Sequence, residues 1–340
     1  MPNPIRLAII GTGLIVTAKH WPALTALQSQ FRIVALANRS AAKAEKLADS
    51  IHAVTGFRPP VYTDYRELLA SEKPEAVSLA LPPALNPEVT EASLAAGCHV
   101  LAEKPIAARL GDGRRMLAWA KEYGRVLMIA ENYRYKVTYR HAAQLIAAGA
   151  IGRPTVARWS IYHYIAEDNP YNLTAWRQQP AHIGGYLSDA GVHWIAVLRM
   201  LLGEIEAVSA QVIQVRPDMV PADTFSATLH FANGALATLS ATHAVPGPET
   251  ALQVAGPDGV LLAGKDKLEL WRKDRPAEEW TEPSPVDGLV AMYEDFAQTV
   301  RAGKSPKATA ADALADLRVI AALLRSSENA GRVTRVAEMD

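Results

Sequence analysis

Two residues four positions apart, Asp189 and His193, carry side chains that can transfer a proton. Because this spacing places both on one face of a helix, a carboxylate and an imidazole would lie close together. A histidine titrates near neutral pH and suits the role of proton carrier when an alcohol and a ketone interconvert. The structural alternative is that Asp189 interacts with the helix dipole and His193 is a hydrogen-bonded core residue.

A glycine motif near residue 10 predicts a dinucleotide site. An apolar segment ends at Ile10 and is followed by Gly11-Thr12-Gly13-Leu14-Ile15 and then a helical pattern. In such a unit the first glycine permits a tight turn and the second lets backbone N–H groups approach a pyrophosphate. The third motif position is Val16 instead of Gly or Ala, so we expect the helix slightly farther from the strand.

The end of the second strand indicates which dinucleotide binds. In NAD-binding units an acidic residue there holds the ribose hydroxyls, but here the strand ends in Asn38-Arg39-Ser40. Asn38 can still bond a ribose hydroxyl, while Arg39 and Ser40 suit a 2′-phosphate. We therefore predict NADP as the preferred cofactor and NAD as an alternative. The structural interpretation makes Arg39 an exposed loop residue and Ser40 a helix cap.

A third motif, Glu103-Lys104-Pro105, directly follows an apolar strand pattern. The carboxyl ends of strands in a doubly wound sheet face the ligand crevice, so Lys104 could reach both the nicotinamide ribose and a substrate hydroxyl. Pro105 would fix the backbone of the turn and with it the direction of the lysine. Taken alone, a lysine in such a place is more often a solvated surface residue.

Aromatic and arginine side chains near these motifs suit a polyhydroxylated substrate. The candidate substrate-binding residues are Tyr133, Arg134, Tyr162, His163 and Tyr186. Tyr133 and Trp176 could equally pack at a domain interface, and His163 lies in an alternating run for which a strand face is the simpler explanation. His182 and His193 are well separated and no cysteine or carboxylate completes a ligand set, so we expect no metal site.

The elements that must position these residues fall into two regions. Up to residue 131, apolar runs alternate with helical patterns, as expected for parallel strands covered on both faces. Strands are predicted at Arg6–Ile10, Phe31–Ala37, Ala76–Leu81, His99–Ala102 and Val126–Ala130, and helices at Ala41–Ser50, Tyr65–Leu69, Pro87–Ala96 and Gly111–Glu122. The first region is therefore predicted to be a Rossmann domain, an α/β doubly wound parallel sheet spanning residues 1–131.

From residue 132 to 340 the pattern indicates an α+β domain for substrate binding and oligomerisation. Extended segments that alternate apolar and polar residues predict a largely antiparallel open sheet, and Asn233-Gly234 is a strong hairpin signal. Helices are predicted at Tyr139–Ala148, Ala190–Leu202 and Ala310–Ser327. Whether the last of these packs back on the first domain is left open. The flat face of the sheet suggests a homodimer or homotetramer.

Composition excludes several classes of function. The 340 residues include 35 basic and 35 acidic side chains, and no basic stripe stands out, which argues against nucleic acid or a membrane surface as partner. The single cysteine, Cys98, excludes an internal disulfide and is expected in the core of a cytoplasmic protein. No segment reaches the roughly 18 to 20 apolar residues that a membrane span needs.

Together these motifs resemble the Gfo/Idh/MocA family of oxidoreductases. The resemblance covers nearly the whole chain and rests on the glycine turn, the segment Leu94–Pro105, the Trp176-Arg177 pair and Asp189-x-Gly191-x-His193. It implies a Rossmann domain with bound NAD(P), a C-terminal sheet domain that often builds dimers or tetramers, and catalytic positions at Lys104, Asp189 and His193. The candidate cofactor-binding set is completed by Leu81, Pro82, Asn86, Glu103, Lys104, Trp176 and Arg177.

The chain departs from the family pattern at two places. Pro83 and Asn86 replace the polar and imidazole groups usual near the cofactor, and Tyr186 places a phenol where the third glycine before the catalytic aspartate is expected. We expect Gly184 and Gly185 to leave room for a cofactor or sugar. The expected reaction is hydride transfer between nicotinamide and a secondary alcohol or ketone of a sugar, polyol or related cyclic compound. A redox-assisted glycoside hydrolase and a non-catalytic NADP-binding regulator are the alternatives.

Overall fold

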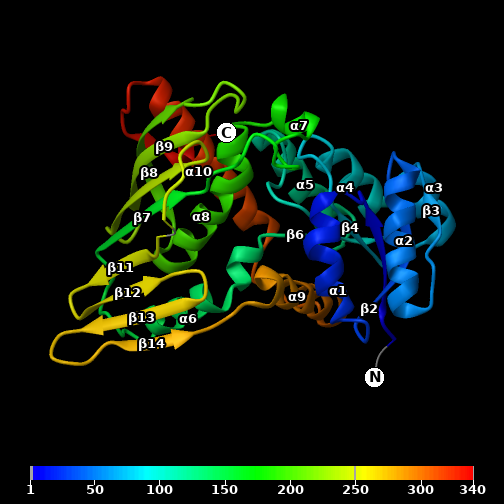
Figure 1. The fold of residues 1–340 in the computed structure, drawn as a ribbon, viewed down its shortest axis with the longest axis horizontal. Helices are drawn as coiled ribbons and strands as arrows, with labels where there is room; N and C mark the ends of the chain where they lie inside the picture. Colours follow the sequence, from blue (N-terminus) through cyan, green and yellow to red (C-terminus); the bar gives the residue numbers. More distant parts are fainter. Residues whose placement is uncertain (1–2, 249, 340) are drawn as a thin grey trace. The chain divides into compact units, whose positions relative to one another are not determined.

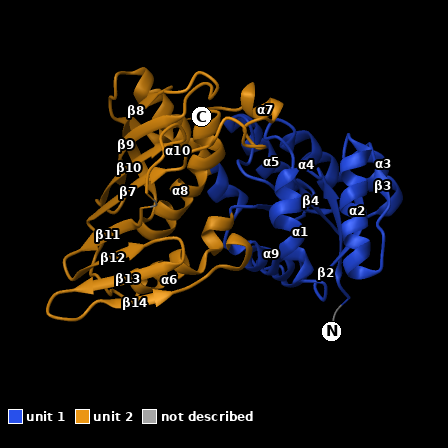
Figure 2. Cartoon of the chain, in the orientation of Figure 1, with its two compact units in different colours: residues 1–131, 288–314 blue, residues 132–287, 315–340 orange. Residues whose placement is uncertain are grey.

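The computed structural model of the chain describes residues 3–248 and 250–339, and its ribbon is shown in Figure 1. Two compact units are distinguished in Figure 2. Unit 1 runs to residue 131 and includes residues 288–314, while unit 2 comprises residues 132–287 and the chain from residue 315. Residues 288–314 thus lie with the first unit, which differs from the predicted division into 1–131 and 132–340. The C-terminal helix α10 (Ala310–Glu328) crosses the division after Leu314.

Helix α9 (Leu289–Ala302) explains why this late segment belongs to unit 1. Its Tyr293 ring packs edge-on against Phe31, and its Phe296 ring stacks on Phe31 with an interplanar angle of 6°. Tyr293 and Phe296 are fully buried. The aromatic side chains of α9 therefore complete the core of the sheet that the first 131 residues form.

Within the described residues, unit 1 contains a six-stranded parallel sheet in the order β3-β2-β1-β4-β5-β6. This confirms the predicted doubly wound sheet. The order reverses between β1 and β4, so the ligand crevice of such a fold opens where these strands end. The strands are β1 Ile5–Ile10, β2 Phe31–Ala37, β3 Val61–Tyr62, β4 Ala76–Leu79, β5 His99–Ala102 and β6 Leu127–Ile129.

Helices cover the sheet of unit 1 on both faces (Figure 1). The chain enters the first of them through a π-helical turn, η1, and not through a regular α-helix. The helical segments are η1 Val16–His20, α1 Trp21–Thr25, α2 Ala41–Thr55, α3 Tyr65–Glu72, α4 Asn86–Ala95 and α5 Leu110–Glu122, with α9 from the later segment. Cys98 is fully buried as predicted, and its burial raises the pKa of the thiol to about 11.

The described part of unit 2 contains a nine-stranded sheet in the order β14-β13-β12-β11-β7-β10-β9-β8-β15. The β7–β10 pair is parallel and the other described pairs are antiparallel, which confirms the predicted mostly antiparallel sheet. The strands are β7 Val156–Tyr162, β8 Ile205–Ile213, β9 Thr224–Phe231, β10 Leu236–Thr242, β11 Leu252–Gly256, β12 Gly259–Ala263, β13 Lys267–Arg272, β14 Glu278–Thr281 and β15 Thr334–Arg335.

One face of this sheet packs against helices α6 (Val137–Ala147) and α8 (Tyr186–Leu202). Trp159 on β7 contacts Tyr139 of α6, and Phe225 on β9 contacts Trp194 of α8. Alternate residues along β7 and β9 are buried, as the predicted period of two requires. The short elements η2 (Asn132–Tyr135), α7 (Ala175–Gln178), η3 (Pro285–Gly288) and η4 (Val336–Glu338) complete the described fold.

Local backbone geometry confirms two of the predicted turns. Gly234 has a φ of +85° in the turn between β9 and β10, and the Asn233 side chain accepts a hydrogen bond from Ala235 N. Helix α8 ends at Gly203, whose φ is +92°, but it begins at Tyr186, four residues before the predicted start. In the described part of the chain, no helix has the length and apolar character required to cross a membrane.

Candidate active site

The glycine motif lies at the carboxyl end of β1, where the strand order of unit 1 reverses. Gly11 has a φ of +91°, and a Cβ there would lie 2.3 Å from the carbonyl oxygen of Ala80, just beyond β4. Only glycine therefore permits this close approach of the two strand ends. A Cβ on Gly13 would have no atom within 4 Å, so the backbone beside Gly13 is open to a ligand.

Asn38 fastens the glycine turn to the end of β2. Its side-chain oxygen accepts a hydrogen bond from Thr12 N (3.2 Å), and its side-chain nitrogen donates to Ser40 O (2.9 Å). Thr12 Oγ1 is buried and has no hydrogen-bond partner among the described residues. Since a buried hydroxyl normally has a partner, Thr12 Oγ1 provides a group for a bound dinucleotide. These features fit the predicted cofactor.

Arg39 and Ser40 are exposed directly after β2. Ser40 occupies the N-cap position of α2, but its side chain makes no capping hydrogen bond. Within residues 3–248 and 250–339, Arg39 forms no hydrogen bond or ion pair. The guanidinium and the hydroxyl are thus both available to an anionic group, as the predicted 2′-phosphate contact requires. Leu14 is also exposed, and Ile15, Leu81 and Pro82 are partly exposed.

Asn86 lies against the backbone on both sides of Lys104. It is fully buried, and its side-chain nitrogen donates to the carbonyl oxygens of Glu103 (2.9 Å) and Pro105 (3.2 Å). Its side-chain oxygen has no hydrogen-bond partner among the described residues, and a contact of Asn86 with the cofactor stays a prediction. Asn86 holds the backbone on both sides of Lys104, whose peptide bond to Pro105 is cis. Lys104 itself is partly exposed.

A buried hydrogen-bond chain that sequence reasoning missed holds the Glu103 carboxylate. His20 Nε2 lies 2.8 Å from Glu103 Oε1, and His20 Nδ1 lies 2.8 Å from the Tyr293 hydroxyl, which is 3.0 Å from Ser78 Oγ. A consistent assignment has Ser78 donating to Tyr293, Tyr293 to His20 and His20 to the carboxylate. His20 and Tyr293 are 273 residues apart, and no local pattern links them. Burial raises the pKa of Tyr293.

In unit 2, Asp189 and His193 project from one face of α8. Between residues 191 and 199 every position is buried except His193, which is partly exposed. Asp189 Oδ2 accepts a hydrogen bond from Arg177 Nε on α7 at 2.8 Å, and the two side chains are about equally exposed, at 15% and 14%. The ion pair fixes the position of the Asp189 side chain one helical turn before His193.

The glycines before α8 serve packing within unit 2. A Cβ on Gly185 would lie 2.5 Å from Val220 O, and a Cβ on Gly184 would lie 3.2 Å from Leu324 of α10. Gly184 and Gly185 also have positive φ values. The expectation that they leave room for a cofactor or sugar is therefore corrected: protein atoms already border both positions.

Two predicted substrate contacts are buried instead. Tyr186 is 3% exposed and its hydroxyl donates to Asn172 Oδ1. Arg134 is 8% exposed and its guanidinium lies 3.4 Å from Asp316. Both side chains are occupied by partners inside unit 2, so the structure contradicts their assignment to the substrate. Their sequence motifs indicate position along the chain but not depth below the surface.

Tyr162 and His163, at the end of β7, have different positions relative to the candidate site. Tyr162 pairs in register with Thr242, which pairs with Thr224, and this row lies on the sheet face opposite Phe225 and α8. Tyr162 is therefore on the wrong face to meet a substrate beside His193, and that prediction is corrected. His163 is exposed, and its ring lies 5.3 Å from the His243 ring, which stacks on Trp194 of α8. The role of His163 in substrate binding stays a prediction.

The Trp176-Arg177 pair occupies the middle of α7. The Arg177 guanidinium lies over the Trp176 ring at 4.0 Å and over the Tyr171 ring at 5.3 Å. Both residues are partly exposed. These contacts fix the arginine that binds Asp189, and contact of the pair with the cofactor stays a prediction.

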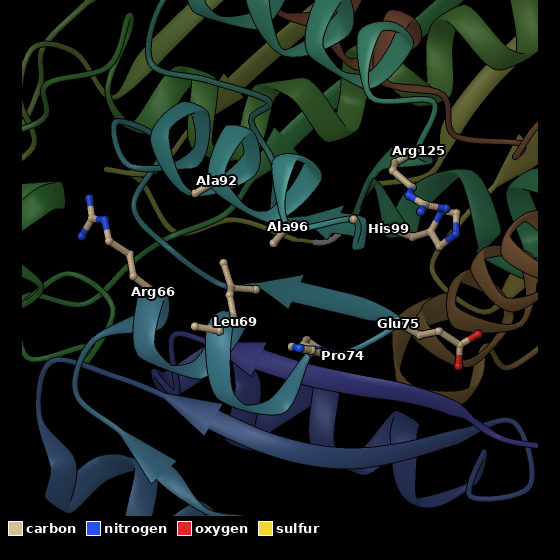
Figure 3. A pocket seen from close by; sticks show the side chains of 11 residues that line it. Arg66, Leu69, Pro74, Glu75, Ala92, Ala96, His99 and Arg125 are labelled. Atoms are coloured by element: carbon tan, nitrogen blue, oxygen red, sulfur yellow. The ribbon is translucent and has the colours of Figure 1, made fainter.

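The pocket in Figure 3 lies away from these residues. It has a volume of about 790 Å³ and is lined by Glu75 and His99, at the amino ends of β4 and β5. The nucleotide edge of a doubly wound sheet is at the carboxyl ends of its strands, so this pocket is not the candidate active site. Among the described residues, no group of three or more His, Cys, Asp or Glu side chains could hold a metal ion.

Comparisons with known proteins cover both units. The model of the oxidoreductase family with an NAD-binding Rossmann fold matches residues 5–131, and that of the GFO/IDH/MocA C-terminal domain matches residues 139–262. The crystal structure of an oxidoreductase from Thermotoga maritima is similar with a TM-score of 0.91 and 34% sequence identity, covering 99% of this chain and 100% of that chain.

Curated relatives extend the similarity. D-xylose 1-dehydrogenase (NADP(+)) 2 from Haloferax volcanii is 28% identical over 97% of this chain and 99% of its own length. A Saccharomyces cerevisiae protein is 32% identical over 68% of this chain, and the match spans 65% of that relative. The glycine turn on a doubly wound sheet, the matches to both domain models and the Thermotoga likeness agree: this chain belongs to the GFO/IDH/MocA family of oxidoreductases.

Proposed function

We propose that the protein oxidises a secondary alcohol, or reduces the corresponding ketone, of a sugar, polyol or related cyclic compound with NADP(H) or NAD(H). The observation that carries the proposal is the pair on α8, where His193 is the partly exposed residue in a buried run and Asp189, bound to Arg177, lies one turn before it. The similarity to a D-xylose dehydrogenase supports the carbohydrate class.

Different side chains of this protein have different roles in alcohol oxidation. His193 takes the hydroxyl proton in oxidation and returns it in reduction, because an imidazole exchanges protons near neutral pH. Lys104 positions the hydroxyl and stabilises the negative charge that develops on its oxygen. Asp189, aligned by Arg177, orients the substrate or His193. The nicotinamide, when bound, supplies or accepts the hydride.

Unit 1 supplies the residues for the cofactor. Gly11, Thr12 and Gly13 form a turn at the carboxyl end of β1 in which backbone is open and one buried hydroxyl lacks a described partner. Arg39 and Ser40 would bind a 2′-phosphate, which makes NADP the proposed preference.

The test is the absorbance change of the nicotinamide with NADP and NAD in parallel, against a panel of sugars, polyols and keto-sugars. A substrate-dependent change is expected with the wild-type protein. His193→Ala should lower turnover by about 10²–10⁴-fold, the usual contribution of a positioned acid–base group, and leave cofactor affinity nearly unchanged. His52→Ala, which removes an exposed histidine from α2, serves as the matched control.

The outcomes separate this proposal from its competitors. Loss of cofactor affinity in His193→Ala would make the residue structural. Substrate cleavage without a net absorbance change would indicate a redox-assisted hydrolase, while tight cofactor binding without turnover on any substrate would indicate a regulator.

A further inference from the structure

The imidazole of His193 is stacked on an aromatic ring from a different element. Tyr133 belongs to the short helix η2, and the centroids of its ring and the His193 ring are 4.4 Å apart with an interplanar angle of 13°. Such a near-parallel contact is lost when rotation about χ2 tilts the imidazole out of this plane. Tyr133 therefore selects one orientation of the plane that carries the two ring nitrogens.

The Tyr133 ring is held in turn by a buried cation. Lys136 is 7% exposed, and its ammonium nitrogen lies 3.7 Å from the centroid of the Tyr133 ring. An ammonium removed from water requires compensating interactions, and the negative face of an aromatic ring is one of them. Because the contact is attractive only over the ring face, it also restricts the tilt of Tyr133.

A second contact joins Tyr133 to the core of unit 2. Its ring stacks on Tyr139 of α6 at 6.1 Å, and the Tyr139 ring meets Trp159 of β7 edge-on at 5.8 Å. Tyr139 and Trp159 are each 5% exposed. The imidazole thus stands at the end of a row of rings whose inner members are fixed by packing.

We propose that Tyr133 and Lys136 are positioning residues that set the ring orientation of His193 for proton transfer. The proposal rests on the proposed function of His193, and it replaces the substrate contact predicted for Tyr133. A ring that stacks on the imidazole and lies under an ammonium has its π system engaged by the protein, whereas a sugar-stacking ring presents a free face.

The first test needs no substrate. Protein labelled with ¹³C-histidine gives ring C–H signals in NMR spectra, and His193→Asn identifies the signal of His193. Stacking on Tyr133 should shift this signal upfield by the ring current of the phenol. The shift should persist in Tyr133→Phe and in Lys136→Arg, disappear in Tyr133→Leu, and shrink in Lys136→Met. An unchanged His193 signal in Tyr133→Leu would overturn the proposal, whether or not any activity is found.

The second test separates positioning from substrate contact by steady-state kinetics. Tyr133→Leu and Lys136→Met should lower kcat by about ten- to a hundredfold, the range expected for misplacement of a catalytic group, with KM and the cofactor Kd unchanged. Tyr133→Phe and Lys136→Arg should restore kcat. A rise in KM with constant kcat would assign Tyr133 to the substrate and refute positioning.

The same set of variants provides a control for loss of folding. If Tyr133→Leu fails to fold, Lys136→Met, compared with Lys136→Arg, carries both measurements, because it leaves all the rings in place. Failure of the proposed function has a different signature, namely an upfield-shifted His193 signal in a protein that turns over no substrate.

Discussion

At the scale of single residues, Arg39 is the side chain proposed to bind the 2′-phosphate that distinguishes NADP from NAD. The guanidinium is exposed after β2 and makes no ion pair within the described residues, so its charge is not already neutralised. Arg39→Ala should weaken NADP binding by about ten- to a hundredfold, the loss expected for hydrogen bonds to a charged group.

NAD lacks the 2′-phosphate, so its affinity for Arg39→Ala should stay that of the wild type. Titration of each cofactor by protein fluorescence gives both dissociation constants. Lys46→Ala removes the same charge from an exposed position of α2 and should change neither. Equal losses for NAD and NADP in Arg39→Ala would contradict the assignment to the 2′-phosphate.

The protonation of His243 should affect stability. It is 1% exposed, its Nδ1 donates to His163 O at 3.1 Å, and its Nε2 has no partner among the described residues. Burial, with a smaller contribution from His163, lowers the pKa of His243 from 6.5 to about 4, against the opposing charges of Asp189 and Asp223. The folded protein therefore keeps this imidazole neutral where the unfolded chain protonates it.

Stability should consequently fall as the pH falls from about 6.5 to about 4. In this window the unfolded chain binds one more proton at this site, so the free energy of unfolding loses about 3 kcal/mol from His243 alone. His243→Phe retains a ring against Trp194 and cannot titrate. Urea unfolding at several pH values should show a shallower slope for this variant, and an unchanged slope would disprove the linkage.

At the scale of elements, α9 fixes the loop that carries Lys104 through the hydrogen-bond chain of Tyr293, His20 and Glu103. Tyr293→Phe keeps the packing on Phe31 but leaves His20 Nδ1 and Ser78 Oγ without this partner. The free energy of unfolding should fall by about 1–3 kcal/mol, the cost of unsatisfied buried groups.

Chemical denaturation of Tyr293→Phe measures this loss directly. Tyr123→Phe removes a phenol hydroxyl from a residue that is 37% exposed at the end of α5, and it should change stability by no more than about 0.5 kcal/mol. If Tyr293→Phe and Tyr123→Phe change the free energy of unfolding by the same amount, the buried hydrogen-bond chain contributes nothing to stability.

The sheet elements were predictable because their patterns are local. Continuous apolar runs such as Phe31–Ala37 identify buried parallel strands, and the alternation in Thr224–Phe231 identifies a strand with one covered face. Helix α9 was missed because its helical pattern directly follows the two prolines Pro283 and Pro285, which favour a loop. Strands β12 and β14 are short and lack clear alternation.

The candidate site was predictable to the extent that its residues stand in motifs. Lys104, Asp189 and His193 are set apart by spacing and by the ends of elements, and their catalytic roles stay predictions. His20 and Lys136 could not be found in this way, because their importance arises from partners that folding brings together. The burial of Asn86 could not be predicted for a related reason: its motif gives its order in the chain but not its depth below the surface.

At the scale of the whole molecule, the open face of the unit 2 sheet should support self-association. Val156 and Leu236 pair in register and are 50% and 44% exposed, and Tyr162 and Ile213, 43% and 55% exposed, lie on the same face. Exposed apolar side chains gathered on one sheet face are typical of a protein interface. We expect a dimer or tetramer built on this face.

Leu236→Lys should therefore shift the protein toward the monomer, because a charge placed in an interface has to be desolvated on association. Sedimentation equilibrium measures the mass directly. Leu173→Lys introduces the same charge at a site 58% exposed outside the sheet and should leave the mass unchanged. A wild-type protein that sediments as a monomer would refute the expectation.

The passage of the chain between the two units has a consequence for the evolution of such proteins. The polypeptide passes from one unit to the other after residues 131, 287 and 314. The second segment that belongs to unit 1 brings Tyr293 and Phe296 into the core of that unit. A gene fragment that ended at residue 131 would encode a sheet with Phe31 and Ser78 uncovered. The nucleotide-binding unit thus cannot be exchanged by one recombination event, because an intact transfer needs three coordinated junctions. We therefore expect new specificities in this architecture to arise more readily by point substitution than by shuffling of whole units.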